Sequence, residues 1–406
     1  MSTIVSKTGR TQVHFREDIC RKEFFATWDG WRSFWSERRA YRTFCSYPWM
    51  PQWIRWGMTM RGRPWFETER YSEDHRLDMV IESLADEAKR EIAQQVLSIV
   101  LDLYTAGWAH RDLHARNLFL LDDGRVMLKD YETMTQYGAS KPSFLSSYDI
   151  TGRGLPSPYR TGNMGFFSNN QYLPSSVLGN ALKVIPEDVP VLLAEILREE
   201  YRMASSTFKT DGGRHRCRAS LPYNSFRLAH LTIDAHEAQR DSQKRFAKIG
   251  LSRSDIEGKT IMDLGCHAGG MLFALQQFRP ASSLGFEYDE EKVKTARRIA
   301  ALEDLRSVEF RQADVDRLTL LELGGRKEVV LCLAIERHVR NPRRLFRLLG
   351  KACSGMLIFE GNAGSNPQQI EKELKANGFR EVEYRGFCDD DILPDNNVRP
   401  LWVARK

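Results

Sequence analysis

Two stretches of this sequence carry groups whose types and spacing suit catalysis. The first is HRDLHARN, residues 110–117, which is followed by an apolar run, a DDG turn and VMLKDYE. Phosphoryl transfer needs a carboxylate that accepts a hydroxyl proton, and oxygen ligands that hold Mg²⁺ against the phosphates. Asp112 supplies the carboxylate, and Asn117 and Asp130 supply the metal ligands. The first stretch therefore predicts a phosphoryl-transfer site in which Asp112 and Asn117 are catalytic.

The order and spacing of these three residues resemble the catalytic loop and the magnesium-binding segment of the protein-kinase fold. Two differences stand out. DYE replaces the usual DFG, so Glu132 occupies the place of a glycine, and no GxGxxG loop precedes the site. Both features are closer to the lipopolysaccharide and sugar kinases of bacteria. The resemblance covers about residues 1–200 and implies an α+β protein-kinase-like fold that uses ATP and Mg²⁺. A kinase-like domain that has lost catalysis remains the alternative.

The resemblance also requires a lysine that reaches the nucleotide phosphates from a central strand. In ICRKEF the side chains of Cys20 and Lys22 point to one face, because strand side chains alternate. We expect Lys22 to be catalytic and to bind the phosphates, with Cys20 under the adenine. Glu37, in the helical pattern FWSERRAY, is the expected partner of Lys22 at the nucleotide site. Asp149 resembles the buried aspartate that braces the catalytic loop.

The second stretch with chemical potential is KTIMDLGCHAGG, residues 259–270, where a strand pattern ends in a glycine turn before a helix pattern. Glycine lets the backbone approach a ligand closely. Acids at the ends of successive strands can receive a cationic amine, both hydroxyls of a ribose and the amine of an adenine. The predicted cofactor ligands are Asp263, Gly265, Gly269, Glu287 and Asp314. By this pattern alone, a dinucleotide such as NAD fits as well.

The DLGCxxG core and the spacing to the following acids resemble the class I S-adenosylmethionine-dependent methyltransferases. His267 stands where the middle glycine is usual. The resemblance covers about residues 240–406 and implies an α/β Rossmann-like fold with S-adenosylmethionine as cofactor.

Further residues are expected near the methyl acceptor. His338, in AIERHV at a strand end, is the predicted proton acceptor and counts among the catalytic residues. An anionic phosphate acceptor would need orientation and no base. The arginines expected to grip such a phosphate precede or flank the second domain: Arg214, Arg216, Arg218, Arg240 and Arg245.

Periodicity along the chain predicts the elements that position these groups. Alternating patterns such as TQVHFRE and DICRKEF predict antiparallel strands near the N-terminus, and EAKREIAQQVLSIVLDLYTAG predicts an amphipathic helix. From about Leu228 strand and helix patterns alternate, which is typical of a parallel, doubly wound sheet. The predicted organisation is a kinase-like domain at 1–205, a linker at 206–239 and a methyltransferase domain at 240–406.

Composition narrows the class of protein. The 406 residues include 42% hydrophobic and 28% charged ones, which excludes collagen-like, mostly disordered and polytopic membrane proteins. The net charge of +6 suits anionic substrates but does not indicate nucleic-acid binding. Seven scattered cysteines without a CxxC pair suggest neither zinc nor a disulfide framework, and no apolar run is long enough to span a bilayer. We therefore expect a cytoplasmic protein without a transmembrane segment.

The two resemblances together predict a bifunctional kinase–methyltransferase. The pairing is similar to bacterial enzymes that cap O-polysaccharides by phosphorylating the terminal sugar and methylating the phosphate, although those enzymes carry the methyltransferase first. The resemblance implies a glycan or lipid-linked glycan acceptor, a glycosyltransferase partner and a peripheral location at the inner membrane. Two alternatives stay open: modification of separate groups on a small metabolite, and a methyltransferase with a pseudokinase that recruits a partner.

Overall fold

The computed structural model describes residues 2–5, 10–151, 178, 182–210, 213–217 and 220–406. The chain forms two compact units, Met1–Leu193 and Ala194–Lys406. Most of the Gly-, Ser- and Asn-rich segment after residue 151 lies outside the described residues.

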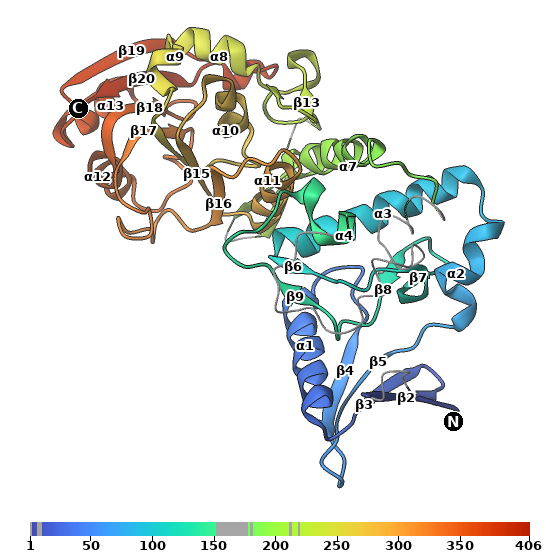
Figure 1. The fold of residues 1–406 in the computed structure, drawn as a ribbon. Coiled ribbons are helices and arrows are strands. Elements are labelled where there is room, and N and C mark those ends of the chain that lie inside the picture. The colour runs from blue at the N-terminus through green and yellow to red at the C-terminus, as the bar shows by residue number, and fades with distance from the viewer. Residues whose placement is uncertain (1, 6–9, 152–177, 179–181, 211–212, 218–219) are drawn as a thin grey trace. The chain divides into compact units, whose positions relative to one another are not determined.

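The first unit begins with a five-stranded antiparallel sheet of order β1-β2-β3-β5-β4. Its strands are β1 Ser2–Val5, β2 Thr11–Arg16, β3 Ile19–Phe24, β4 Trp53–Met58 and β5 Pro64–Glu69. Helix α1, Trp28–Phe44, follows β3 and packs against β3 and β5 (Figure 1). The Thr27 hydroxyl caps this helix by accepting a hydrogen bond from the backbone N–H of Gly30. Large rings fill the core between helix and sheet, with Phe24 5.5 Å from Phe34 and 5.3 Å from Phe66.

The rest of the first unit is mainly helical with short strand pairs. Helix α3, Asp86–Thr105, buries one apolar face and coincides with the predicted amphipathic helix. Two antiparallel pairs follow, β6 Trp108–Ala109 with β9 Thr135–Gln136, and β7 Leu118–Leu120 with β8 Val126–Leu128. Short helical turns complete this part: η1 Glu73–His75, α2 Leu77–Val80, η2 Ile81–Ser83, η3 Ala115–Asn117, η4 Phe144–Ser146 and α4 Tyr148–Thr151. The HRDLHARN segment therefore lies between β6 and β7, and Asp130 follows β8.

The second unit is built on a Rossmann-like mixed sheet of seven strands in the order β16-β15-β14-β17-β18-β20-β19. The strands are β14 Thr260–Leu264, β15 Ser282–Glu287, β16 Val308–Gln312, β17 Lys327–Leu333, β18 Cys353–Glu360, β19 Glu381–Phe387 and β20 Pro400–Arg405. The first five are mutually parallel, as predicted, but β20 runs antiparallel between β18 and β19. A loop joins β19 to β20 without a crossover helix, and the two strands therefore pair in antiparallel fashion, as in a hairpin.

Helices cover this sheet. They are α10 Gly270–Leu275, η8 Gln276–Phe278, α11 Glu290–Leu302, α12 Pro342–Ala352 and α13 Pro367–Ala376. Contacts pair α11 with β15 and β16, α12 with β17 and β18, and α13 with β19 (Figure 1). The core between them is a continuous apolar cluster that includes Phe286, Phe359 and Trp402. The fully buried strands read as apolar runs because both faces are covered.

The segment before the sheet is part of the second unit. Helix α7, Asp188–Ser205, crosses the boundary between the units. Residues 206–239, predicted as a linker, form two antiparallel pairs: β10 Thr207–Thr210 with β11 Gly213–Arg216, and β12 Phe226–Arg227 with β13 Thr232–Ile233. The turn η7 Ala235–Glu237 and the helices α8 Ser242–Ile249 and α9 Arg253–Ile256 lead into β14, and η9 Pro394–Asn396 lies in the loop before β20. Among the described residues, no helix combines the length and apolar character needed to cross a bilayer.

Candidate functional site

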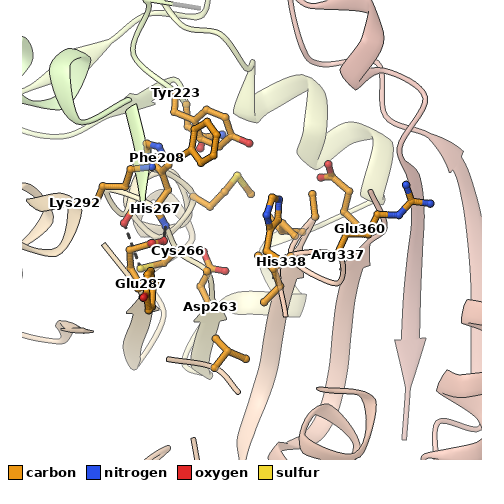
Figure 2. A pocket seen from close by; sticks show the side chains of 18 of the residues that line it. Phe208, Tyr223, Asp263, Cys266, His267, Glu287, Lys292, Arg337, His338 and Glu360 are labelled. Carbon is orange, nitrogen blue, oxygen red and sulfur yellow. Dashed lines mark hydrogen bonds between the residues drawn. The ribbon is translucent and has the colours of Figure 1, made fainter. Parts of the chain in front are cut away.

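A pocket of about 740 Å³ lies in the second unit, where β14, β15 and β17 end. The predicted cofactor ligands Asp263, Gly265, Glu287 and Asp314 line it, together with the predicted proton acceptor His338. Figure 2 shows Asp263 between the side of Glu287 and His267 and the side of His338 and Glu360. The carboxyl ends of parallel strands meet at one sheet edge, which explains why these residues converge.

Packing and backbone conformation explain the two glycines of the turn after β14. Gly265 and Gly269 have φ values of 80° and 82°, a region that L side chains rarely adopt. A Cβ on Gly265 would lie 2.5 Å from Ile335 Cγ2, and one on Gly269 would lie 2.6 Å from the ring of Phe310. Gly265 lines the pocket, as a cofactor ligand should. Gly269 does not line it, and a side chain there would meet core rings instead.

Asp263, the next-to-last residue of strand β14, is an acid of the pocket with an unpaired oxygen among the described residues. Its side chain is buried, and its Oδ1 has no hydrogen-bond partner among the described residues. Burial and, to a smaller extent, the nearby Glu287 carboxylate raise the pKa of Asp263 to about 7, although Arg245 opposes the shift. A buried, unsatisfied carboxylate is costly, so this oxygen is suited to a cationic ligand group.

Glu287, at the end of β15, already orders the glycine turn. Its Oε2 accepts a hydrogen bond of 2.9 Å from the backbone N–H of His267, and its Oε1 accepts one of 3.0 Å from Asp289. A carboxylate oxygen has two lone pairs, so each can accept a further bond from a ligand hydroxyl. Asp314, after β16, accepts the backbone N–H of Asp316 at 2.9 Å.

His338 follows β17 and lines the same pocket. Burial lowers the pKa of its imidazole, and the charges of Arg399 and Lys292 lower it further. The neutral ring that results at neutral pH can accept a proton.

The structure corrects the expectation that Arg240 and Arg245 clamp an anion. Arg240 is fully buried and its Nε lies 2.9 Å from Asp391 Oδ2, and it does not line the pocket. Arg245 lines the pocket but is paired with Glu360 at 2.9 Å and with Asp390 at 3.0 Å. Both guanidinium groups are therefore neutralised by acids, and the ion pairs hold the loop before β20 against α8.

Of the other arginines expected at the phosphate, the two that the structure describes, Arg214 and Arg216, do not line the pocket. Arg214 makes a bidentate ion pair with Asp289, at 2.6 and 2.7 Å. Arg216 is exposed on β11, and Arg218 lies outside the described residues. The arginines that do line the pocket, besides Arg245, are Arg337, Arg340 and Arg399.

Sequence reasoning missed several pocket residues. Tyr223 stacks on His267 with ring centroids 4.6 Å apart and an angle of 25° between the planes. Asn224 and Lys292 also line the pocket and are 3% and 4% exposed. Tyr223 and Asn224 belong to the expected linker, and Lys292 stands in the charged run YDEEKVK. None of the three therefore carried a sequence signal for a binding site.

The first unit gathers the residues of the first stretch around a lysine. Lys22 on β3 donates hydrogen bonds to Glu37 of α1 and to Asp130 Oδ1, the latter at 2.8 Å. Glu132 lies 3.7 Å from the same Nζ. Burial lowers the pKa of Lys22, but the charges of Asp130, Glu37 and Glu132 outweigh this effect. The pKa of Lys22 is therefore raised well above its usual value. The ligand oxygens of these three acids lie within 4.8 Å of one another, close enough to hold a cation.

The predicted catalytic loop is ordered by hydrogen bonds. Asn117 Nδ2 donates to the backbone carbonyl of Asp112 at 2.9 Å and to its Oδ2 at 3.3 Å. The backbone N–H of Lys129 donates to the carbonyl of Asn117 at 2.8 Å, which brings the start of the Asp130 segment beside Asn117. Asp149 is buried and accepts the backbone N–H groups of His110 and Arg111 at 2.7 and 2.9 Å. The described contacts thus place Asp112, Asn117 and Asp130 in one region.

Comparison with known proteins separates the two units. Residues 255–384 match a family model described as a methyltransferase domain. The ubiquinone biosynthesis O-methyltransferase of Acinetobacter baylyi is 30% identical over 118 residues, which are 28% of this chain and 47% of that protein. The tRNA U34 carboxymethyltransferase of Desulfotalea psychrophila is 25% identical over 215 residues, which are 47% of this chain and 66% of that protein. The chain spans about half the length of the first of these relatives.

Among solved structures, the N-terminal domain of EvdMO1 with SAH bound is 20% identical and covers 52% of this chain and 95% of its own, with a TM-score of 0.35. An S-adenosylmethionine-dependent methyltransferase from Mesorhizobium loti is 18% identical and covers 37% of this chain and 93% of its own, with a TM-score of 0.32. The C-terminal half of the chain contains a class I S-adenosylmethionine-dependent methyltransferase domain. None of these matches assigns the N-terminal half.

Proposed function

We propose that the second unit binds S-adenosylmethionine in its pocket and transfers the methyl group to an acceptor oxygen. The observation that carries this proposal is the buried Asp263 carboxylate, whose Oδ1 has no partner among the described residues. Its strand β14 pairs with β15, the strand that ends in Glu287. S-adenosylmethionine carries an ammonium, a sulfonium and a ribose diol. These groups complement one unsatisfied acid and a second acid with spare lone pairs.

The cofactor supplies a methyl group activated by its attachment to a sulfonium. In this proposal Asp263 holds the ammonium, Glu287 accepts the ribose hydroxyls and Asp314 lies toward the adenine amine. Gly265 lets the backbone turn under the cofactor without a side chain. Orientation of acceptor and methyl group in a pocket of this kind is the main contribution that the protein makes to rate.

If the methyl acceptor is a hydroxyl, we propose that His338 takes its proton; an anionic phosphate oxygen needs orientation and no base. Its pKa is lowered from the usual 6.5, so the base form is present at neutral pH. General-base catalysis of this kind typically contributes about 10²–10⁴-fold. The relatives act, by their names, in ubiquinone biosynthesis and on tRNA U34. An oxygen acceptor fits the placement of a neutral base.

Calorimetric titration of S-adenosylmethionine, followed by transfer of a labelled methyl group, tests this function. Glu287→Gln should weaken binding by about 1–3 kcal/mol, because it removes charge-assisted hydrogen bonds. Glu291→Gln, an exposed acid of α11, is the matched control and should bind as the wild type does. Equal affinity in the wild type and both variants would mean that the ribose is held elsewhere.

We propose phosphoryl transfer from ATP as a second activity, in the first unit. The supporting observation is the contact of Lys22 with Glu37 and Asp130 on segments far apart in the chain. Lys22 would bind the nucleotide phosphates, Asp130 and Asn117 would hold Mg²⁺, and Asp112 would accept the proton of the attacking hydroxyl. The protein-kinase-like fold of this unit is part of the same proposal.

The acceptor we propose is a hydroxyl of a glycan or lipid-linked glycan, with methylation of the phosphate as the next step. This choice rests on the fusion of the two activities and on their resemblance to capping enzymes. Product mass separates it from modification of two groups on one small metabolite, because the phosphate and the methyl would lie on one fragment. ATP turnover separates it from a pseudokinase that only recruits a partner.

We propose that the protein binds peripherally to an anionic membrane, where a glycosyltransferase partner would also act. Exposed residues of the first unit support this proposal. We use the name tryptophan–arginine surface for the following exposed residues of α1 and of the β4–β5 hairpin: Trp28, Arg32, Trp35, Arg42, Ile54, Trp56, Met58, Met60 and Arg61. Trp28, Arg32 and Trp35 are spaced along one face of α1, and Arg38 lies over the rings of both Trp35 and Trp56, at 5.1 and 4.9 Å. Tryptophan with arginine on an exposed amphipathic face is typical of interfacial membrane binding.

A further inference from the structure

Lys292 is a buried cation in the pocket of the second unit, and the described part of the chain offers it no partner. Its residue is 4% exposed, and it makes no hydrogen bond or ion pair with any residue that the structure describes. It lies in the first turn of α11, soon after Glu287. A buried lysine is normally paired, because removing an ammonium from water is costly. The pocket therefore holds a positive charge that nothing in the described chain neutralises directly.

Two further polar groups on the same side of the pocket lack partners. His267 Nδ1 and Asn224 Nδ2 are both buried and without a hydrogen bond in the described structure. Tyr223 joins them, since its ring stacks on His267 and its neighbour in the chain is Asn224. Figure 2 shows Lys292, His267 and Tyr223 together, away from His338, Arg337 and Glu360. An amide nitrogen donates, and a neutral imidazole presents N–H at Nδ1 in one of its tautomers.

None of the described hydrogen bonds or ion pairs joins these donors to the acids of the pocket. The carboxylate of Glu287 instead accepts the backbone N–H groups of His267 and Asp289, and Glu360 is paired with Arg245. The neighbouring Lys209 also lines the pocket but is paired with Glu290 at 3.1 Å. Among the described residues, Lys209 thus has an acidic partner and Lys292 has none.

We propose that Lys292, with Asn224 and His267, forms an anion subsite that binds a carboxylate or phosphate group of a ligand in this pocket. The inference deepens the proposed methyltransferase function and rests on it. The anion has two sources that share this chemistry: the carboxylate of the cofactor's amino-acid end, and an anionic group on the methyl acceptor. Ammonium-to-carboxylate and ammonium-to-phosphate bonds are charge-assisted and are roughly twice as strong as neutral ones.

The test compares Lys292→Met with Lys294→Met. Methionine keeps the length and apolar stem of lysine, and Lys294 lies on the same helix but does not line the pocket, so it controls for loss of one positive charge. Each protein is titrated with S-adenosylmethionine, with S-adenosylhomocysteine, with 5′-methylthioadenosine, which lacks the amino-acid end, and with inorganic phosphate in the presence and absence of S-adenosylhomocysteine. Circular dichroism and melting temperature check that each variant is folded.

If the cofactor supplies the anion, Lys292→Met loses about tenfold to a hundredfold in affinity for S-adenosylmethionine and S-adenosylhomocysteine and none for 5′-methylthioadenosine. If the acceptor supplies it, cofactor binding is unchanged, while phosphate binds the wild type and Lys294→Met but not Lys292→Met. Either result supports the subsite.

The subsite is overturned if Lys292→Met and the wild type bind all four ligands equally. That result leaves the proposed function intact as long as the wild type binds S-adenosylmethionine. A wild type that binds no cofactor instead contradicts the proposed function, and the phosphate titration without cofactor then decides the subsite by itself.

Discussion

Lys22 Nζ lies 2.8 Å from Asp130 Oδ1, although 108 residues separate the two positions in the chain. The lysine therefore occupies the space among Glu37, Asp130 and Glu132 that a cation would otherwise take. In the nucleotide-free protein we infer that Lys22 competes with Mg²⁺ for these acids. Binding of ATP would draw the ammonium toward the phosphates and leave Asp130 for the metal.

Lys22→Met should raise the affinity of the nucleotide-free protein for a divalent cation, because three clustered carboxylates lose the ammonium that contacts them in the described structure. The same variant should lose ATP binding and unfold more easily, by about 3–5 kcal/mol, since breaking a buried ion pair leaves charge uncompensated. Mn²⁺ titration followed by electron paramagnetic resonance measures the first effect. Lys129→Met is the control, because this partly buried lysine lies over the rings of Tyr71 and Phe119 and outside the cluster. Equal Mn²⁺ binding by the wild type and Lys22→Met would contradict the competition.

Asp112→Asn should reduce phosphoryl transfer by about 10²–10⁴-fold, the usual cost of losing a general base. Its affinity for S-adenosylmethionine should stay at the wild-type value. If phosphate is the methyl acceptor, this variant should fail to methylate fresh acceptor but should methylate acceptor already phosphorylated by the wild type, because a phosphomonoester keeps a nucleophilic oxygen at neutral pH. Methyl transfer with and without prior phosphorylation is the measurement. Equal transfer to unphosphorylated acceptor would favour two independent modifications.

S-adenosylmethionine binding should depend on pH through Asp263. Its pKa of about 7 in the folded protein lies above the usual 3.8, so the ligand-free fold binds this proton more tightly than the unfolded chain does. The resulting stabilisation is complete below about pH 4 and is lost as the pH rises through about 7. The ionised form, however, is the one that binds an ammonium. Affinity should rise about tenfold between about pH 6 and 8, with proton release on binding.

Asp263→Asn should remove both effects. At about pH 8 the ligand-free variant should melt a few degrees above the wild type, because an amide carries no charge to bury. Its cofactor binding should be weak and independent of pH. Calorimetry in buffers of different ionisation heat measures proton release, and a wild-type affinity that is flat across this range would contradict the assignment.

Trp28→Ser combined with Met60→Ser should weaken binding to vesicles that contain anionic lipid. Both side chains are strongly exposed, at 84% and 107% of their reference areas, so the change should not disturb the core. Met203→Ser, an exposed methionine outside this surface, is the control. Co-sedimentation with anionic and with neutral vesicles is the measurement. Equal vesicle binding by all three proteins would contradict the membrane role. If the wild type binds no vesicles but captures another protein through this surface, the surface binds a protein partner instead.

Local pattern was enough to predict the parts of both sites that depend on short segments. Strand alternation places Lys22 on a defined face of β3, and the ends of parallel strands bring Asp263 and Glu287 to one edge. The antiparallel orientation of β20 was harder to predict, because the residue pattern of a strand does not specify its direction in the sheet.

The fate of the buried arginines could not be predicted from sequence. Arg240 and Arg245 stand in a charged stretch that we expected to grip an anion, and their acidic partners Asp390 and Glu360 lie more than 100 residues away. Lys292 is the opposite case, since it follows two acids in sequence yet contacts neither in an ion pair. In both cases tertiary packing decides whether a charge is exposed, paired or left for a ligand.

The place of β20 in its sheet has a consequence for synthesis of the protein. Pro400–Arg405 lies between β18 and β19 and hydrogen-bonds to both, so β19 has no neighbour in the sheet until these residues are available. On the ribosome, the emerging second unit would expose the apolar edge of β18 throughout translation of residues 361–399. The first unit, by contrast, is complete well before that point. Chaperone demand during biosynthesis should therefore be concentrated on the second half of the chain, in the interval before its last strand leaves the exit tunnel.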